Sequence, residues 1–359
     1  MYPALAVAEL IRQQHPEANL TFVGSVGGFE KPLIEASTVQ FNEYREVRAG
    51  PVVGVNPLRL INSLFQLFLG LVQSLGILRQ LKPNVIFLTG GWVGLPIALA
   101  SEVFRIPSLI YLPDIEPGAT IRALQRFADQ VAVTTSDSSA YITPSKMVVT
   151  GYPLRQDMLE AAQPEGRQKA IAHFQLDPNR KTVLVFGGSR GARSINQAVM
   201  KIAPQLLSQG LQIIHVTGTL DWEQNKQEWD ALGAPNAYHL YPYLHDDMGL
   251  AMAAADLVIC RSGASTLAEL PLFSLPSILV PYPHAWRYQK VNAEWLAQRG
   301  AAVVMEDEKM ATELLPTIQE LMQDDAKWRT MRDAARALAK PEGTENVTGA
   351  LLRLAGGSR

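Results

Sequence analysis

Short apolar segments of strand type alternate with segments of helical periodicity along most of this chain. Strands are expected where apolar residues run together between turn-forming residues, and helices where apolar residues recur every three or four positions. The expected strands are 20–24, 84–88, 108–112, 130–134, 182–186, 213–217, 257–260 and 276–280, and the expected helices include 58–81, 119–128, 166–174 and 345–354. This alternation predicts an α/β fold.

The expected helix 58–81 contains an uncharged run, 60–78, whose length is close to that of a membrane span. Its less hydrophobic residues recur at three or four positions and form one stripe: Arg59, Asn62, Ser63, Gln66, Gly70, Gln73 and Ser74. We therefore expect an amphipathic helix. Its apolar surface, which includes Phe65, Phe68 and Leu69, either belongs to the core or contacts a membrane between the basic residues Arg59, Arg79 and Lys82.

Two of the expected strands lead into paired glycines. Segment 84–88 precedes Gly90 and Gly91, and segment 182–186 precedes Gly187 and Gly188. Glycine lets the backbone approach a ligand or adopt positive φ. Neither segment matches the GxGxxG fingerprint or a P-loop. Because the pattern occurs in both halves, it predicts two Rossmann-like domains that face one cleft.

The stretch 257–293 carries the strongest chemical signal. A strand is followed by a small-residue turn at 261–263 and a helix from about Ala264, an arrangement that directs backbone N–H groups and a helix dipole at one point. Such a point suits a diphosphate, and Glu269 is placed to accept hydrogen bonds from a ribose diol. The loop after the next strand carries polar side chains of the kind that a sugar needs: His284, Arg287, Gln289 and Asn292.

Composition narrows the possible classes of protein. A chain of 359 residues is long enough for two domains, and a net charge of −2 gives no reason to expect nucleic acid as a partner. The single cysteine, Cys260, excludes an internal disulfide, and there is no Cys/His cluster with metal-ligand spacing. The first residues lack the basic region of a signal peptide, so a cytoplasmic protein is expected.

The segments RSGASTLAE, 261–269, and VPYPHAWRYQKVNA, 280–293, together resemble the MurG family of glycosyltransferases, and the resemblance extends over nearly the whole chain. It implies a GT-B fold and metal-independent, inverting transfer of N-acetylglucosamine from UDP-N-acetylglucosamine to lipid I, which gives lipid II, with no cofactor. It also implies roles in peptidoglycan synthesis, cell wall biogenesis, cell shape, cell division and the cell cycle. The expected location is peripheral, on the cytoplasmic face of the cell membrane.

The resemblance also implies a set of site residues. GYPLR, 151–155, is similar to the family's GNPxR, whose arginine reaches the donor diphosphate, and LHDDM, 244–248, is close to FIDDM beside the uracil. The implied donor-binding residues are Arg155, Ser189, His245, Arg261, Ser262, Gly263, Ala264, Glu269, Gln289 and Asn292. The implied acceptor-side residues are Gly90, Gly91, Trp92 and Asp114.

The sequence departs from the family in two places. MurG-like proteins have a strand and a GGTGGH-type loop before the segment that resembles YPALAVAEL, 2–10, and this chain starts one residue after the histidine of that loop. We therefore expect a truncated or mis-started chain whose first domain lacks its first strand. The second departure is YLPD, 111–114, where the family commonly reads HEQN. Asp114 is the best remaining candidate for the general base, and it ranks below the absent loop histidine.

The expected organisation is an acceptor and membrane-side domain, 1–155, a UDP-sugar-binding domain, 156–340, and a last helix, 341–359, that packs back on the first domain. Two alternatives remain open. One is a nucleotide-sugar-binding protein without turnover, which the missing loop and the altered 111–114 segment both allow. The other is a related GT-B transferase with another lipid acceptor, because the donor residues match the family better than the acceptor residues do.

Overall fold

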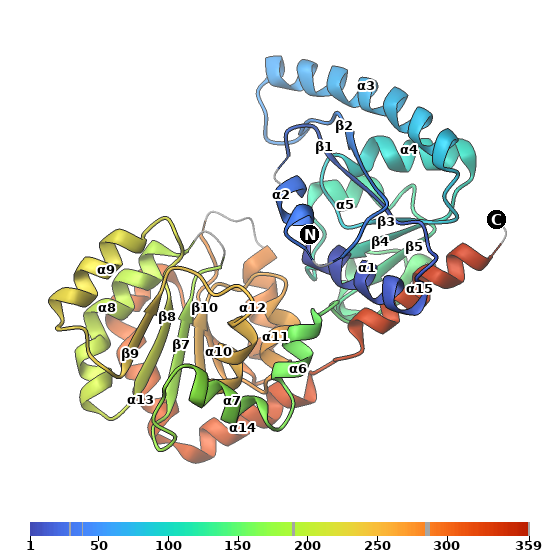
Figure 1. Cartoon of the computed structure of the whole chain (residues 1–359). Coiled ribbons are helices and arrows are strands. Elements are labelled where there is room, and N and C mark those ends of the chain that lie inside the picture. The colour runs from blue at the N-terminus through green and yellow to red at the C-terminus, as the bar shows by residue number, and fades with distance from the viewer. Residues whose placement is uncertain (29, 38, 189–190, 284–287, 358–359) are drawn as a thin grey trace. The chain divides into compact units, whose positions relative to one another are not determined.

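The computed structural model describes residues 1–28, 30–37, 39–188, 191–283 and 288–357. The chain divides into two compact units (Figure 1). Unit 1 comprises Met1–Arg155 together with Glu342–Arg359, and unit 2 comprises Gln156–Pro341. Both units are built of parallel strands and connecting helices. The expected α/β fold with two Rossmann-like domains is confirmed.

The described residues of unit 1 form six strands in two parallel sheets. Its strands are β1 (Thr21–Ser25), β2 (Glu43–Val47), β3 (Ile86–Leu88), β4 (Ser108–Leu112), β5 (Gln130–Val133) and β6 (Met147–Val149). Strands β1 and β2 form one sheet, and β3, β4, β5 and β6 form the other in that order. Within the described part of the chain, no strand joins these two sheets.

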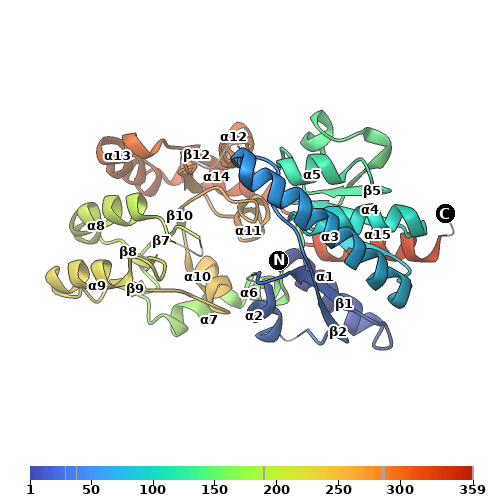
Figure 2. The same ribbon diagram turned by 90° about the horizontal axis from the view of Figure 1, so that it is seen from above.

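The helices of unit 1 cover these sheets and include the C-terminal helix. They are α1 (Tyr2–Gln14), α2 (Glu30–Glu35), α3 (Pro57–Leu81), α4 (Gly94–Phe104), α5 (Ala119–Leu124) and α15 (Gly343–Gly356), with 3-10 turns η1 (Ser136–Ala140) and η2 (Pro144–Lys146). Helix α15 packs against α1, near which it lies in Figure 2, and against β4. The Thr344 hydroxyl donates to the Leu154 carbonyl at 2.8 Å, and the Asn346 amide donates to the Thr150 carbonyl at 3.0 Å. These bonds join the end of the chain to unit 1.

Helix α3 turns mainly small and polar residues inward, whereas several of its large apolar residues face outward. Its buried residues are Ser63, Gly70, Ser74 and Leu78. Phe65 and Phe68 are 57% and 61% exposed, so the alternative that placed them in the core is wrong. The helix is long and apolar enough to cross a membrane by length and composition, a test that core helices of soluble proteins also pass.

Unit 2 contains one six-stranded parallel sheet. Its strands are β7 (Thr182–Phe186), β8 (Gln212–Val216), β9 (Tyr238–Tyr241), β10 (Leu257–Cys260), β11 (Ser277–Leu279) and β12 (Ala302–Val304). Its helices are α6 (Gln156–Ala161), α7 (Gly166–His173), α8 (Arg193–Ser208), α9 (Trp222–Ala231), α10 (Met248–Ala254), α11 (Thr266–Leu272), α12 (Tyr288–Gln298), α13 (Met310–Gln323) and α14 (Asp325–Ala337), with the 3-10 turn η3 (Asp307–Lys309). The strand order is β12-β11-β10-β7-β8-β9, the doubly wound order of a dinucleotide-binding fold.

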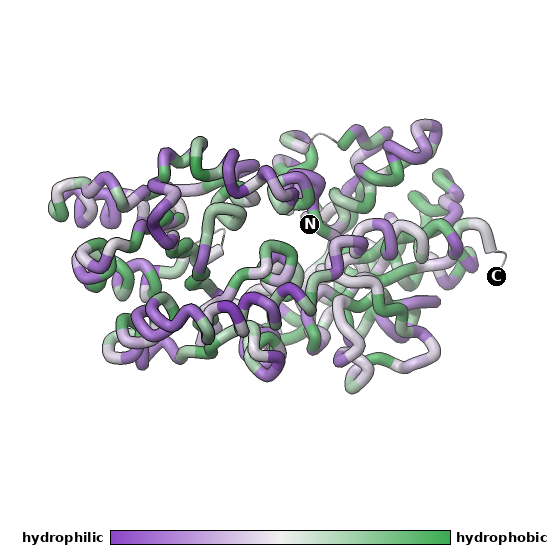
Figure 3. Tube along the Cα trace, turned by 90° about the horizontal axis from the view of Figure 1, so that it is seen from below, coloured by the Kyte–Doolittle hydropathy of each residue, from purple (hydrophilic) through white to green (hydrophobic). Residues whose placement is uncertain are grey.

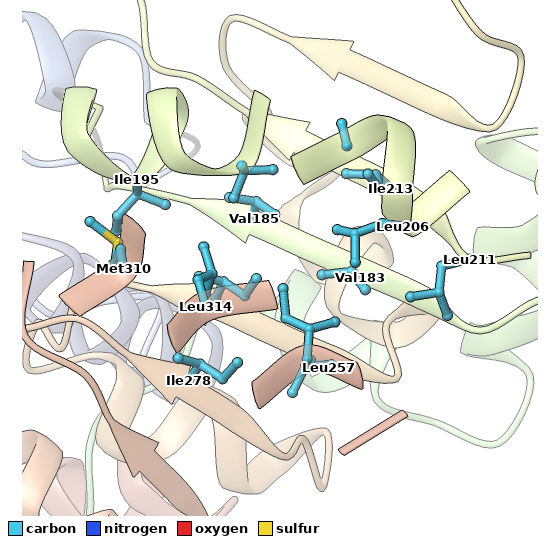
Figure 4. Close-up of a cluster of buried hydrophobic side chains, with 14 of the residues drawn as sticks. Val183, Val185, Ile195, Leu206, Leu211, Ile213, Leu257, Ile278, Met310 and Leu314 are labelled. Atoms are coloured by element: carbon cyan, nitrogen blue, oxygen red, sulfur yellow. The ribbon is translucent and has the colours of Figure 1, made fainter. Parts of the chain in front are cut away.

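The core of unit 2 lies between this sheet and helices α8 and α13. Apolar side chains from β7, β8, β10 and β11 meet Ile195 and Leu206 of α8 and Met310 and Leu314 of α13 (Figure 4). Each fully buried Leu or Ile side chain stabilises the fold by roughly 1.5–3 kcal/mol relative to an exposed one. Hydrophobic and hydrophilic positions alternate along the helices of the unit (Figure 3), as expected for helices that cover a sheet with one face.

A polar group lies inside this core. The ring of His215 on β8 is fully buried between the hydroxyl of Tyr238 on β9, 2.8 Å from Nδ1, and the side-chain oxygen of Asn196 on α8, 3.0 Å from Nε2. Burial lowers the pKa of His215 from 6.5 to about 3, because the charged ring would lose its hydration. The ring is therefore neutral near pH 7.

Several element boundaries differ from the sequence-based expectations. The helix expected over 119–128 ends at Leu124, and the helix expected from Ala264 begins at Thr266. Strands β2, β6, β9 and β12 were not predicted. Strands β6 and β12 lie in apolar runs but contain only three residues each, whereas β9 reads YHLY and β2 reads EYREV, so the signals are short or mixed. Their positions depend on pairing with neighbouring strands.

The packing of α3 can be tested with two glycines of the same helix. A Cβ on Gly70 would overlap the Arg48 carbonyl oxygen, whereas a Cβ on Gly76 would meet no atom within 4 Å. We expect Gly70→Ala to lower the free energy of unfolding of unit 1 by about 1–3 kcal/mol, because the helix must move away from its support. Gly76→Ala should raise it by up to about 1 kcal/mol through helix propensity. Urea unfolding measures both, and equal effects would contradict the close contact at Gly70.

The buried His215 predicts that unit 2 loses stability in acid. A lowered folded-state pKa means that the unfolded chain binds the proton more readily, so this contribution is lost as the pH falls below 6.5. Between pH 7 and pH 5 the loss is about 2 kcal/mol. Denaturant unfolding of the wild type and of His215→Gln at both pH values measures this loss. The difference between the two proteins isolates the contribution of His215, because all other groups titrate in both. A stability difference that does not change with pH would contradict a neutral buried ring.

Candidate functional site

The strand order of unit 2 fixes where a ligand is expected. From β7 the chain proceeds outward through β8 and β9, and from β10 it proceeds in the opposite direction through β11 and β12. Strands β7 and β10 are neighbours, with Phe186 paired with Cys260 at their carboxyl ends. The connections after these two strands lead in opposite directions, and such a place is called a switch point. In α/β proteins, ligands bind at the carboxyl edge of the sheet beside the switch point. The glycines after β7 and the turn after β10 both lie at this edge.

The turn after β10 is held by hydrogen bonds to α12. Ser262 is fully buried, and its hydroxyl donates to the Gln289 carbonyl at 2.7 Å. The amide of Asn292, also fully buried, donates to the Ser262 carbonyl at 3.3 Å, and the side-chain oxygen of Gln289 accepts from the backbone N–H of Tyr282 at 2.9 Å. Ser262, Gln289 and Asn292, all predicted to bind the donor, therefore also fix the shape of the edge.

Three consecutive backbone N–H groups follow Ser262 in this turn. Among the described residues, the N–H groups of Gly263, Ala264 and Ser265 have no hydrogen-bond acceptor. The first N–H groups that are bonded here belong to Thr266 and Leu267, which donate to the carbonyls of Gly263 and Ala264. Successive backbone N–H groups in a turn form a cradle for an anion. The turn before α11, rather than the helix itself, thus offers the donors.

Arg261 is a structural residue in this arrangement. It is 9% exposed, and its guanidinium forms an ion pair with the Asp307 carboxylate and donates to the Val280 carbonyl at 3.1 Å and to the Ser194 hydroxyl at 2.8 Å. These partners come from η3, from the end of β11 and from the start of α8. The side chain of Arg261 thus joins three segments of unit 2, and its contact with a ligand stays a prediction.

Glu269 lies in the first turn of α11, closer to the helix start than expected. Its carboxylate is half-buried and accepts a hydrogen bond from the Ser265 hydroxyl at 2.8 Å. This bond orients the carboxylate toward the start of the helix. The contact of Glu269 with a ribose stays a prediction.

The glycines after β7 allow very close backbone packing. A Cβ on Gly187 would overlap the backbone nitrogen of Ala192, and a Cβ on Gly191, whose φ is +79°, would overlap the Thr217 carbonyl oxygen. Only glycine fits both positions without movement of the neighbouring strand. The predicted donor residue Ser189 lies outside the described residues, as do His284 and Arg287 of the loop before α12.

His245 and the acidic pair after it lie between β9 and α10. The His245 side chain is exposed and stacks edge-on against Tyr243 with ring centroids 4.6 Å apart. Asp247 occupies the N-cap position of α10, but its side chain makes no cap hydrogen bond, and its carboxylate lies 3.3 Å from the Nε2 atom of His173.

The predicted acceptor-side residues lie in unit 1 at the carboxyl ends of neighbouring strands. Gly90, Gly91 and Trp92 follow β3, and both glycines have positive φ, +99° and +78°. Asp114 follows β4, which pairs with β3, and is half-buried. The four residues thus share one edge of one sheet, and their contact with an acceptor stays a prediction.

Two neighbours of this edge involve aromatic rings. Tyr111, where the family reads histidine, is fully buried, with its hydroxyl 2.9 Å from the Thr134 hydroxyl. Burial raises the pKa of Tyr111, so this hydroxyl stays protonated. Arg155, at the end of the first segment of unit 1, has its guanidinium carbon 5.3 Å from the centroid of the Tyr2 ring. This cation–π contact places the predicted diphosphate ligand residue beside the start of the chain.

A cavity of about 430 Å³ in unit 2 lies away from the candidate site. Its lining includes Arg167, Asp256, Pro276 and Trp328, which are at the amino ends of β10 and β11 or on the helices beside them. Arg167 is paired with Asp256 and donates to the Ala254 carbonyl at 2.9 Å, so the arginine serves the fold. The candidate site is at the carboxyl ends of the strands, so this cavity is not part of it.

Sequence reasoning missed three groups that shape the site. Asp307 and Ser194 hold Arg261, and the buried group of Asn196, His215 and Tyr238 lies below the glycines after β7. The sequence contained one signal for the buried group, because His215 lies between the apolar residues Ile214 and Val216 in the strand QIIHV. Cys260, at the end of β10, is fully buried, and burial raises the pKa of its thiol.

Comparison with known proteins gives consistent matches over both units. The model described as "Glycosyltransferase family 28 N-terminal domain" matches residues 1–133, and "Glycosyltransferase family 28 C-terminal domain" matches residues 182–347. A relative from Desulforudis audaxviator is 36% identical, over 99% of this chain and 95% of its own length. A relative from Listeria monocytogenes is 32% identical, over 99% and 96%. Both are named UDP-N-acetylglucosamine--N-acetylmuramyl-(pentapeptide) pyrophosphoryl-undecaprenol N-acetylglucosamine transferase.

Solved structures agree with this result. The crystal structure of MurG from Acinetobacter baumannii matches with a TM-score of 0.75 and 25% identity, over 98% of this chain and 95% of that one. A UDP co-structure of MnaA from S. aureus matches with a TM-score of 0.69 over 100% and 95%, and at 12% identity it supports the fold alone. With similarity along almost its entire length and matches to both characteristic domains, this chain belongs to glycosyltransferase family 28 and, within it, to the MurG family.

Proposed function

We propose that this protein transfers N-acetylglucosamine from UDP-N-acetylglucosamine to an undecaprenyl-diphosphate-linked N-acetylmuramyl-pentapeptide, lipid I, and so forms lipid II in peptidoglycan synthesis. The names of its relatives support the donor and the acceptor. The proposal rests on one observation in unit 2. The glycines after β7 and the N–H groups of the turn after β10 lie at the same carboxyl edge of the sheet. Roles in cell shape and division follow from this reaction.

The donor half of the reaction requires stabilisation of the leaving UDP. When the bond between C1 of the sugar and the diphosphate breaks, negative charge develops on the diphosphate oxygens. The N–H groups of Gly263, Ala264 and Ser265 are fixed donors for such charge, and preorganised donors of this kind lower the barrier because they need no reorientation. We propose that no metal is needed, since these groups supply the electrostatic stabilisation.

Other donor contacts follow from positions in unit 2. The Glu269 carboxylate accepts hydrogen bonds from the ribose diol, and the backbone around His245 contacts the uracil. Gln289 and Asn292 bind the sugar, as the resemblance of the segment 280–293 implies. In the acceptor half, a hydroxyl oxygen of the muramyl sugar attacks C1, and its proton passes to a base.

We propose Asp114 as a base available in this chain. It follows β4 at the same edge as Gly90, Gly91 and Trp92, which contact the acceptor. A half-buried carboxylate at the carboxyl end of a parallel strand can reach a bound hydroxyl, and general base catalysis by such a group contributes about 10²–10⁴-fold to the rate.

The outer face of α3 supports a peripheral location on the cytoplasmic face of the membrane. Leu58, Ile61, Phe65, Phe68 and Val72 are spaced along one side of the helix, and each is more than half exposed. A row of large apolar side chains on one side of a long helix inserts favourably into the boundary between head groups and acyl chains. Basic residues near both ends, Arg59, Arg79 and Lys82, would pair with anionic lipids. A lipid-linked acceptor would then be reached without a membrane span.

The first test is transfer of labelled N-acetylglucosamine to a lipid I analogue by the wild type and by Glu269→Gln. We expect turnover by the wild type and a roughly tenfold higher KM for UDP-N-acetylglucosamine in the variant, because one charge-assisted hydrogen bond to the ribose is weakened. Glu313→Gln, an exposed position on α13, is the charge-matched control and should behave as wild type. Donor binding without transfer to any lipid acceptor would favour a binding protein, and transfer only to another lipid would favour a different GT-B transferase.

The role of Asp114 predicts a different kinetic effect. Asp114→Asn keeps the size of the side chain and removes its basicity, so kcat should fall by about 10²-fold or more while the KM for the donor stays within about threefold. The same transfer assay, run under donor saturation, measures this change. A variant with wild-type kcat would show that another group accepts the proton.

The membrane proposal predicts a loss of vesicle binding when the outer face of α3 becomes polar. Phe65→Ser combined with Phe68→Ser should weaken co-sedimentation with phosphatidylglycerol-containing vesicles by about tenfold or more, because each exposed phenylalanine contributes up to a few kcal/mol when buried in lipid. Leu220→Ser is the matched control, because Leu220 of unit 2 is 69% exposed. If the double variant and the Leu220→Ser control co-sedimented with the vesicles equally well, α3 would be ruled out as the membrane contact.

A further inference from the structure

The buried polar group of unit 2 forms a continuous chain of hydrogen bonds that ends at the candidate site. We call the chain from Tyr238 through His215 and Asn196 to the Thr217 carbonyl the polar relay. Its three hydrogen bonds join Tyr238 Oη to His215 Nδ1 at 2.8 Å, His215 Nε2 to Asn196 Oδ1 at 3.0 Å, and Asn196 Nδ2 to the Thr217 carbonyl at 2.9 Å. The side chains of His215, Asn196 and Tyr238 are all at least 99% buried. The relay spans β9, β8 and the first turns of α8.

The hydrogens of the relay have one consistent direction. Asn196 donates its amide hydrogen to a carbonyl, so its side-chain oxygen faces His215 and Nε2 must carry the ring hydrogen. A neutral ring then accepts at Nδ1, and the Tyr238 hydroxyl supplies that hydrogen. The Met200 sulfur, 3.1 Å from the same hydroxyl, is a much weaker acceptor than the imidazole nitrogen. Each member therefore orients the next.

The last group of the relay supports the glycines after β7. Thr217 follows β8 directly, and Gly191 is packed so closely on its carbonyl that no side chain would fit between them. Asn196 also belongs to the helix turn that begins here, because its backbone N–H donates to the Ala192 carbonyl at 2.9 Å. The Thr217 carbonyl, which the relay holds in place, is thus the group against which Gly191 packs.

The composition of the relay points to a purpose beyond packing. Two neighbours of His215 on β8, Ile213 and Ile214, are apolar and fully buried, so an apolar residue would fill the position without a desolvation cost. A buried polar network is favourable only when every member is satisfied, and a satisfied network specifies one arrangement. Here the specified arrangement is that of the Thr217 carbonyl beneath Gly191.

We propose that His215 is a positioning residue for the donor: acting through Asn196, it sets the backbone of Gly187, Gly188 and Gly191 at the distance that the UDP diphosphate requires. This inference rests on the proposed function, because it assumes that the diphosphate binds at the edge between β7 and β10. It assigns a role to His215 and Tyr238, which touch neither substrate. Loss of the relay should weaken donor binding more than it slows the chemical step.

The experiment compares His215→Leu with His215→Gln. Leucine fills the space without polar atoms, whereas the glutamine amide can donate to Asn196 as Nε2 does. We expect the KM for UDP-N-acetylglucosamine to rise about tenfold in His215→Leu, with kcat and the acceptor KM within about threefold of wild type, and to recover to within about threefold in His215→Gln. The dissociation constant of UDP, measured by calorimetry, should follow the same order.

A purely structural relay gives a different result. Destabilisation alone reduces the folded fraction and therefore kcat, and leaves the KM and the UDP dissociation constant of the folded molecules unchanged, which would overturn the proposal. If His215→Leu does not fold, Tyr238→Phe takes its place, since it removes only the hydroxyl that fixes the ring. An unchanged donor KM in that variant likewise overturns the proposal, and a rise of about threefold supports it.

The proposed function can fail separately. A wild-type protein that neither binds UDP nor transfers the sugar would refute the function itself. A wild type that does both, together with variants of unchanged donor affinity, would refute only the role of His215.

Discussion

The pairing of β7 with β10 is the constraint on which the rest of unit 2 depends. Two parallel strands lie about 4.8 Å apart, so their carboxyl ends bring the next residues of both connections to one place. Phe186 is opposite Cys260, and the glycines and the turn that follow them cannot be displaced without breaking this register. The Arg261 ion pair and the polar relay then act on backbone whose position is already set. A similar logic applies in unit 1, where β3 and β4 bring Gly90 and Asp114 to one edge.

The sequence predicted best those elements that are buried on both faces of a sheet. Strands Thr182–Phe186 and Leu257–Cys260 are continuous apolar runs with clear turn residues after them, and the structure places them at the predicted bounds. Strand β2, with the sequence EYREV, contains three charged residues and, within the described part of the chain, pairs only with β1, so its identity depends on its partner. Helix α3 was predicted as amphipathic, but its periodicity alone could not show which stripe faces inward. Small residues faced inward because the helix lies close to the Arg48 backbone.

Parts of the candidate site were predictable where the residues lie close together in the sequence, but not where the partners are far apart along the chain. The turn after β10 and Glu269 lie within one short motif, whose spacing predicts the geometry. Arg261 shows the opposite case, because its partners Ser194 and Asp307 are 67 and 46 residues away along the chain. Spacing gives no indication of such partners, so the ion pair of Arg261 could not be predicted from the motif that contains it. His215 was overlooked for the same reason, since Asn196 and Tyr238 are 19 and 23 residues away.

The single cysteine has a practical consequence. Cys260 is fully buried at the end of β10, and burial keeps its thiol protonated and therefore a poor nucleophile. A cysteine introduced at an exposed position, such as Gly76 in α3 or Leu220 in unit 2, would be the only thiol that reacts readily with a maleimide dye. The natural chain is thus ready for site-specific fluorescence labelling without prior removal of a cysteine. Dyes on the two units would report their separation as donor and acceptor substrates bind.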